Sequence, residues 1–77
     1  MEKYFYTFGT SLQFPYQRGW VEIHAESSEE ANKKFRSRFP DVNPGTLNCA
    51  FVYTEEQWNK MEPEKNWYGW KCHEIIE

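Results

Sequence analysis

The chain has 77 residues, a formal net charge of −3 and two cysteines. Its size predicts a single domain over residues 1–77, and its negative charge argues against general nucleic-acid binding, which needs a basic surface. No apolar run is long enough for a transmembrane helix, the first residues lack the pattern of a secretory signal, and two cysteines do not make a disulfide framework. We therefore expect a cytoplasmic protein with reduced thiols and no membrane contact.

Aromatic residues dominate the apolar part of the composition. Six Phe, five Tyr and four Trp make up 19% of the chain, and each ring can bury roughly 150–250 Å². A domain of this size has a marginal core and needs such efficient side chains. The rings are therefore expected in the core or on a surface that binds a partner, and the composition favours neither place.

The first strand is predicted over residues 3–8, which are almost all β-forming. The stretch Phe8–Trp20, which connects this strand to the next, then contains two glycines, a proline and four aromatic residues and is longer than a plain hairpin needs. Long ordered loops of this kind often have a function. The alternative is that Phe14 and Tyr16 only cover one end of the small core.

The next two elements are the most clearly patterned part of the chain. Residues 20–25 alternate in polarity, which predicts a strand whose Val21, Ile23 and Ala25 face the core. Ser27 followed by Glu30 is typical of a capping box and predicts a helix over residues 28–38. The apolar stripe of this helix consists of Ala31, Phe35 and Phe39.

The second half of the chain predicts three further elements. A strand is expected at residues 47–53, a short helix at 55–61 after a Thr54–Gln57 capping box, and a last strand at 71–76, which follows an aromatic loop at 62–70. The order β-β-α-β-α-β indicates an α+β fold. We expect a small antiparallel four-stranded sheet with one main helix packed on a face, and aromatic residues on the other face, open to a partner or a second copy.

Metal and cysteine chemistry find little support in the sequence. The soft ligands Cys49, Cys72, His24 and His73 lack the close spacing of a zinc site, so no metal or cofactor is expected, and the thiols are interpreted as small buried hydrophobes. No sequence signature marks a nucleophile. The prediction is that the protein is not an enzyme, with a small cysteine enzyme as the least favoured alternative.

The predicted helix at residues 28–38 ends in a basic group, which consists of Lys33, Lys34, Arg36 and Arg38. One hypothesis is a nucleic-acid-binding module that uses this helix face. The favoured interpretation is that these cations complement the helix dipole and face the solvent, because the net charge of the domain is negative.

The two aromatic loops supply residue types that dominate binding hot spots. The predicted contact residues are Gln13, Tyr16, Arg18 and Trp20 in the first loop, with Trp67, Tyr68 and Trp70 in the second. Aromatic rings beside an arginine can also stack a base and hold a phosphate. A protein surface and a small nucleotide ligand are therefore both candidate partners.

Several segments resemble a group of short uncharacterised proteins encoded in phages and prophages of Gram-positive bacteria. They are Tyr6-Thr7-Phe8-Gly9, Phe14-Pro15-Tyr16, Gly19-Trp20-Val21-Glu22, Glu30-Ala31, Phe35, Phe39-Pro40-Asp41, Leu47-Asn48-Cys49-Ala50-Phe51 and Cys72-His73-Glu74. The resemblance implies a context and assigns no residue a role. It suggests a non-enzymatic accessory binding protein in the host cytoplasm, acting against a host defence by occupying an immune protein or by sequestering a nucleotide signal. A homodimer is also expected, because a second copy could bury apolar surface that the small core of one chain leaves exposed.

Overall fold

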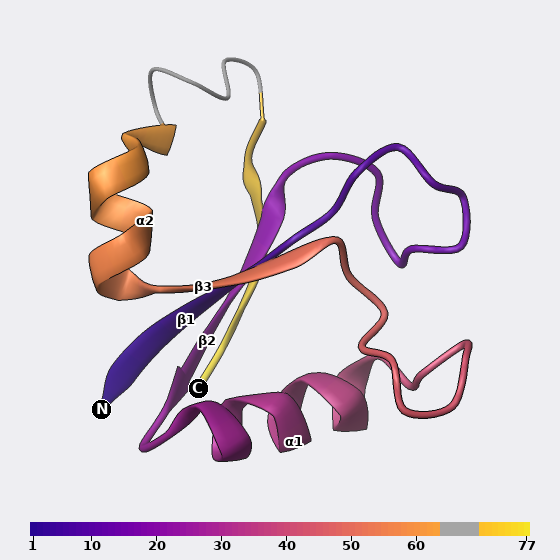
Figure 1. Cartoon of the computed structure of the whole chain (residues 1–77), viewed down its shortest axis with the longest axis horizontal. Coiled ribbons are helices and arrows are strands. Elements are labelled where there is room, and N and C mark those ends of the chain that lie inside the picture. Colours follow the sequence, from indigo (N-terminus) through magenta and orange to yellow (C-terminus); the bar gives the residue numbers. More distant parts are fainter. Residues whose placement is uncertain (64–69) are drawn as a thin grey trace.

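The computed structural model describes residues 1–63 and 70–77. It is an α+β fold, as predicted, with four strands and two helices (Figure 1). In chain order the elements are β1 (Glu2–Thr7), β2 (Trp20–Ala25), α1 (Ser28–Arg38), β3 (Phe51–Thr54), α2 (Glu55–Met61) and β4 (Cys72–Ile76).

The four strands form one mixed sheet in the order β3-β1-β2-β4. β1 pairs antiparallel with both β2 and β3, whereas β4 pairs parallel with β2. The prediction of an antiparallel sheet was therefore wrong. The reason is long-range: β4 follows β3 and α2 in the chain but lies at the opposite edge of the sheet, and a connection of that length permits either strand direction.

The main core lies between the sheet and α1. Its buried side chains are Tyr4, Tyr6, Phe8, Val21, Ile23, Ala25, Ala31, Phe35 and Phe39. The predicted inward face of β2 and the apolar stripe of α1 are both confirmed by this set. Tyr6 and Phe35 stack with their ring centroids 4.4 Å apart, and the Tyr6 hydroxyl donates a hydrogen bond of 2.7 Å to Asn32 Oδ1. Burial of the Tyr6 ring therefore leaves no polar atom unpaired.

The second helix covers part of the opposite face of the sheet. Phe5 points away from Tyr4 and Tyr6 because side chains alternate along a strand, and its ring stacks on Trp58 of α2 at 4.5 Å. Figure 1 shows α1 and α2 on either side of the strands. The expectation of one main helix is thus not confirmed, and that of an open aromatic face is wrong where α2 packs on β1 and β3.

Capping residues and hydrophobic periodicity predicted most boundaries of the helices and strands correctly. β2, α1 and α2 have the predicted bounds, and Thr54 and Gln57 form the predicted capping box at the start of α2. β3 is shorter than predicted and begins at Phe51. Residues 47–50 instead bend, and the Cys49 N–H donates to the Leu47 carbonyl at 2.8 Å.

Candidate functional site

The rings of the first predicted binding loop are part of the core. Phe14 and Tyr16 pack against the buried ring of Phe8, with centroids 6.1 and 5.8 Å away. One face of the Tyr16 ring is also covered by His73, which lies parallel to it at 4.3 Å. This arrangement agrees with the alternative that the two loop rings cover one end of the core.

Polar contacts fix Tyr16 to the rest of the fold. Its hydroxyl donates to Glu74 Oε2 at 3.0 Å, and Arg38 Nε of α1 donates to Glu74 Oε1 at 2.9 Å. The hydrogen bond to Glu74 raises the pKa of Tyr16 above its ordinary value. The loop, α1 and β4 therefore meet at a single carboxylate.

The end of the loop is tied to the start of β4. Arg18 and Gly19 both have positive φ, 65° and 77°, and a Cβ at Gly19 would collide with the Lys71 carbonyl oxygen. His73 Nε2 lies 2.6 Å from the Arg18 carbonyl oxygen, and the Trp20 N–H donates to the Lys71 carbonyl at 3.0 Å. Position 19 therefore requires a glycine.

The structure does not bring the predicted binding residues onto one surface. Tyr16 packs on the α1 side of the sheet, whereas Trp20 contacts Trp58 on the α2 side, at 5.0 Å. Gln13 and Arg18 are exposed on the loop. Trp70 is half-buried just before β4, and Trp67 and Tyr68 lie outside the described residues.

Residues from the segments 9–19 and 40–50 line a groove. Figure 1 shows both segments at one end of the molecule. The volume of the groove is about 230 Å³, and we call it the two-loop groove. Apolar and uncharged polar side chains line it: Gln13, Phe14, Val42, Asn43, Thr46, Leu47, Asn48 and Cys49. The sequence predicted a strand from residue 47 and gave no indication of a groove over residues 41–49. The signal that could have drawn attention to it is Val42, an apolar residue among turn-forming ones.

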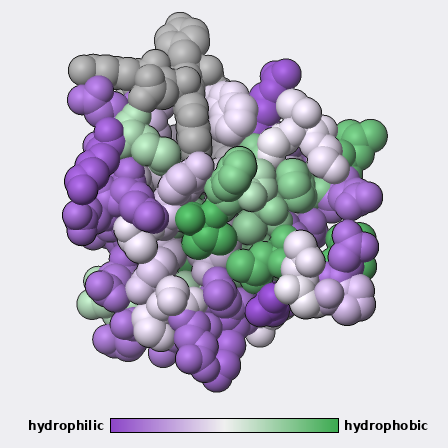
Figure 2. Space-filling view, viewed as in Figure 1, coloured by the Kyte–Doolittle hydropathy of each residue, from purple (hydrophilic) through white to green (hydrophobic). Residues whose placement is uncertain are grey.

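A second hollow, of about 460 Å³, adjoins this groove and reaches β3. The two share Thr46, Leu47 and Cys49, and the second continues along Ala50, Phe51 and Val52. Arg36 also lines it and is already held by Asp41, with Nε at 3.0 and 3.2 Å from the two carboxylate oxygens. Figure 2 shows hydrophobic residues gathered on this face of the molecule.

Three apolar residues that line the two hollows are exposed: Val42 at 55%, Phe51 at 65% and Val52 at 37%. Leu12, which precedes the lining residue Gln13 in the chain, is 89% exposed. Single exposed apolar residues are ordinary, but a group of them beside a hollow is typical of a contact surface.

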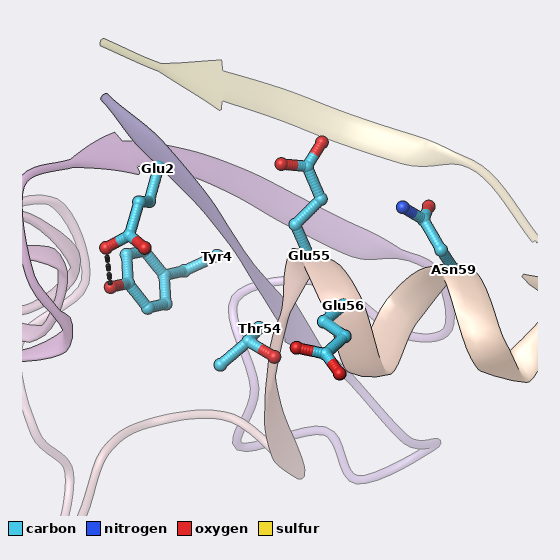
Figure 3. Close-up of a pocket in the computed structure, with 6 residues that line it drawn as sticks. All are labelled: Glu2, Tyr4, Thr54, Glu55, Glu56 and Asn59. Carbon is cyan, nitrogen blue, oxygen red and sulfur yellow. Dashed lines mark hydrogen bonds between the residues drawn. The ribbon is translucent and has the colours of Figure 1, made fainter.

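A further pocket, of about 530 Å³, lies between the start of β1 and α2. Its lining residues are Glu2, Tyr4, Thr54, Glu55, Glu56 and Asn59. Figure 3 shows the Glu55 and Glu56 carboxylates pointing away from each other, while Glu2 accepts a hydrogen bond of 2.9 Å from the Tyr4 hydroxyl. Over residues 1–63 and 70–77, no cluster of three His, Cys, Asp or Glu side chains could hold a metal ion. This pocket therefore offers no geometry for a cation.

Burial shifts both thiols toward their protonated form. Burial raises the pKa of Cys49 to about 11. Burial also raises the pKa of Cys72, and hydrogen bonds with the backbone of Glu74 and Glu22 partly offset that increase. Since the thiolate is the nucleophile, neither environment supports the alternative of a cysteine enzyme.

The basic end of α1 is largely neutralised by carboxylates. Lys34 lies 3.6 Å from Glu30, Arg36 pairs with Asp41, and Arg38 pairs with Glu74. Phosphate binding would have to compete with these pairs, so the geometry does not favour the nucleic-acid alternative.

Comparisons with known protein families, with curated proteins and with solved structures found no match. Neither helix in the described part of the chain is long and apolar enough to span a bilayer.

Proposed function

We propose that this protein is a non-catalytic binding protein that acts by occupying the surface of a partner protein. The observation that supports it best is the exposed side chain of Val42 in the lining of the two-loop groove, together with the exposed Leu12, which precedes the lining residue Gln13 in the chain. Protein contact surfaces combine an apolar centre with polar groups at the rim. Here the amides of Gln13, Asn43 and Asn48 supply that rim.

Hydrogen bonds hold this surface in place before any partner binds. Gln17 Nε2 donates to the carbonyl oxygens of Ser11 and Phe14, at 3.1 and 3.2 Å, and the Phe14 N–H donates to the Ser11 carbonyl at 3.2 Å. An ordered loop loses little conformational entropy on binding. Of the residues predicted to bind, Gln13 lines the groove, and Arg18 is exposed on the same loop.

A protein partner fits this chemistry better than a nucleotide signal does. A nucleotide needs a free ring for its base and cations for its phosphates. His73 covers one face of Tyr16, and over residues 1–63 and 70–77 no cation lines the two-loop groove. The resemblance to phage and prophage proteins supports a host defence protein as the partner. The proposed effect is inhibition by occupation of that partner's surface.

Site-specific photo-crosslinking tests this proposal. A photoreactive residue is placed at position 12, at position 42 or, as the control, at position 75 on β4, where Ile75 is 58% exposed. After irradiation in bacterial cells, positions 12 and 42 should yield the same crosslinked host protein, and position 75 should not. Absence of a crosslink from positions 12 and 42, or the same product from all three positions, would contradict it. Leu12→Lys should then weaken binding of the isolated partner by at least about tenfold.

A further inference from the structure

A groove of about 580 Å³ lies between α1 and β4, and we call it the helix–strand groove. Figure 1 shows the end of β4 beside α1. The helix lines it with the cations Lys33, Lys34 and Arg38, and the strand lines it with Glu74, Ile75 and Ile76. Among these residues the positive side chains outnumber the negative one, although the chain as a whole has a net charge of −3. The pocket beside α2, by contrast, is lined by three carboxylates.

The strand on one side of this groove is open along its outer edge. β4 lies at one end of the sheet order, and in the described part of the chain only β2 pairs with it. The outer backbone N–H and C=O groups of an edge strand can pair with another extended chain. The titratable side chains of β4 are already held within the fold, since His73 contacts the Arg18 carbonyl oxygen and Glu74 accepts hydrogen bonds from Tyr16 and Arg38.

The helix on the other side keeps donors for an anion. Lys33 is exposed, and over residues 1–63 and 70–77 it has no hydrogen bond or ion pair. Arg38 contacts Glu74 through Nε alone, which uses one of the five N–H groups of a guanidinium. Lys34 lies 3.6 Å from Glu30 and is partly neutralised. A single carboxylate in the groove therefore finds donors at Lys33 and Arg38 without displacing an existing pair.

Three properties of the groove together define what fits it. The open strand edge pairs with an extended polypeptide, the cations favour carboxylates, and Ile75 and Ile76 favour apolar side chains. Ile75 is 58% exposed, so an occupant has apolar surface to cover. The phosphates of a nucleic acid would satisfy only the cations. Glu77, which is exposed beyond the end of β4, repels an acidic group there, so the carboxylates of the occupant belong beside α1.

We propose that the helix–strand groove binds an extended acidic segment of a partner protein, which adds a strand to the outer edge of β4 and places its carboxylates beside Lys33 and Arg38. Backbone hydrogen bonds to β4 supply affinity in this mode of binding, and the alternating side chains supply specificity. The protein then has a second contact surface, at the sheet edge opposite to β3. A photoreactive residue at position 75 should accordingly give a product that differs from the one at positions 12 and 42.

The first test is a titration of the isotope-labelled full chain with the synthetic peptide acetyl-Val-Glu-Val-Glu-Val-Glu-amide, followed by amide chemical shifts. Residues 33–38 and Cys72–Ile76 should shift, and Phe51–Thr54 should not. The matched peptide with lysine in place of glutamate should bind at least about tenfold more weakly, because like charges meet in the groove. Shifts confined to the helix, shifts centred on β3 or equal affinity for the two peptides would overturn the proposal. So would groove shifts that appear on concentrating the protein alone and that the peptide does not change, since a second copy would then be the occupant.

N-methylated peptides test the addition of a strand separately from charge attraction. Two versions of the acidic peptide have N-methyl groups on its odd or on its even residues, so each loses the N–H donors along one edge and keeps every charge. Only one edge of an added strand pairs with β4. One version should therefore bind at least about tenfold more weakly than the other. Equal affinities of the two versions would rule out backbone pairing and overturn the proposal.

A charge reversal ties binding to the helix cations. Lys33→Glu should weaken binding of the acidic peptide by at least about tenfold and strengthen binding of the lysine peptide. The matched control is Lys60→Glu, which makes the same charge change on the exposed side of α2 and should leave both affinities unchanged. Equal effects of the two variants would show a general charge effect and contradict the assignment. The peptide tests use no host partner and leave the two-loop groove unaltered, so their failure is independent of the crosslinking result.

Discussion

The two faces of the sheet are covered to different degrees. On the α1 face, Tyr6, Val21 and Ile23 are completely buried under an eleven-residue helix. On the α2 face, the covering helix has seven residues, and the β2 side chains remain half-buried: Trp20, Glu22 and His24. The difference shows that one face supplies most of the hydrophobic core, whereas the other depends on a small aromatic cluster around Trp58.

Polar side chains are also distributed differently between the two faces of the sheet. Glu22 and His24 lie on the half-covered face, with His24 Nε2 2.6 Å from Glu22 Oε2. A carboxylate beside an imidazole is tolerated there because both side chains are only partly buried. On the α1 face the hydroxyls lie at the margin, where Tyr4, Tyr6 and Tyr16 donate to Glu2, Asn32 and Glu74. The largest losses of stability are therefore expected from the α1 face.

Phe35→Ala tests the α1 face most directly. The ring is completely buried and packs against Tyr6, Phe8 and Phe39, so its removal leaves a cavity at the centre of the core. We expect a loss of about 3–5 kcal/mol in the free energy of unfolding, measured by urea denaturation. Since that loss is a large part of the stability of a small domain, the variant is expected to be partly unfolded in buffer. A loss below about 1 kcal/mol would contradict the assignment of this face as the main core.

Trp58→Ala tests the α2 face in the same way. Trp58 stacks on Phe5 with an angle of 2° between the rings and contacts Trp20 edge-on. We expect a loss of about 3 kcal/mol, the low end of the range for a large aromatic residue, because the short helix can move to fill part of the space. Lys60→Ala, on the exposed side of the same helix, is the control and should change stability by less than about 0.5 kcal/mol. Equal losses from Trp58→Ala and Phe35→Ala would remove the distinction between the faces.

The contrast also explains which parts of the fold the sequence could predict. Residues 20–25 alternate and residues 28–38 have a cap and an apolar stripe, so each element was predicted from neighbouring residues alone. The direction of β4 and the packing of Trp58 on Phe5 depend on residues far apart in the chain. No local pattern encodes such a choice, so the sheet was wrongly predicted to be antiparallel, with one face open.

The candidate site was predicted only in part, for a related reason. Composition singled out the loop that contains Gln13, but it could not separate rings that pack inward from rings that face water. Tyr16 and Trp20 are four residues apart and lie on opposite sides of the sheet. The second half of the groove combines Val42, Asn43 and Thr46, in a segment with the composition of an ordinary turn, with Leu47, Asn48 and Cys49, which were predicted to lie in a strand. Only the folded chain brings it beside Gln13.

Gly19→Ala tests the point at which the chain passes from one face to the other. Tyr16 before it packs on the α1 side and Trp20 after it on the α2 side, and Gly19 has a φ of 77° against the backbone of Lys71. The added methyl group should cost about 1–3 kcal/mol through strain and displacement of the start of β4. Gly9→Ala is the matched control, because a Cβ there meets Phe14 at an ordinary 3.7 Å. Similar losses for both variants would show that position 19 has no special constraint.

The smallest expected effect is a difference in reactivity between the two thiols, and it can be measured as alkylation rates on the folded protein. Cys49 packs against the α1-side core, while Cys72 lies in register with Trp20 of the α2 face. Burial raises the pKa of Cys49 to about 11, and backbone hydrogen bonds partly offset the increase at Cys72. We therefore expect iodoacetamide to modify Cys72 first, as read by mass spectrometry of peptides from the folded protein.

The expected pH dependence of Cys49 alkylation follows from the direction in which the pKa of the thiol is shifted. A raised pKa means that the thiolate is scarce below it, so the alkylation rate should grow by about tenfold per pH unit from neutral pH until it levels off near pH 11. Cys72→Ser isolates this rate, and the same measurement in urea gives the reference for an exposed thiol. If Cys49 reacted at the urea rate in the folded protein at neutral pH, its side chain would not be protected by the core. The α1 face would then be open at its margin, and the difference between the two faces would be smaller than the structure indicates.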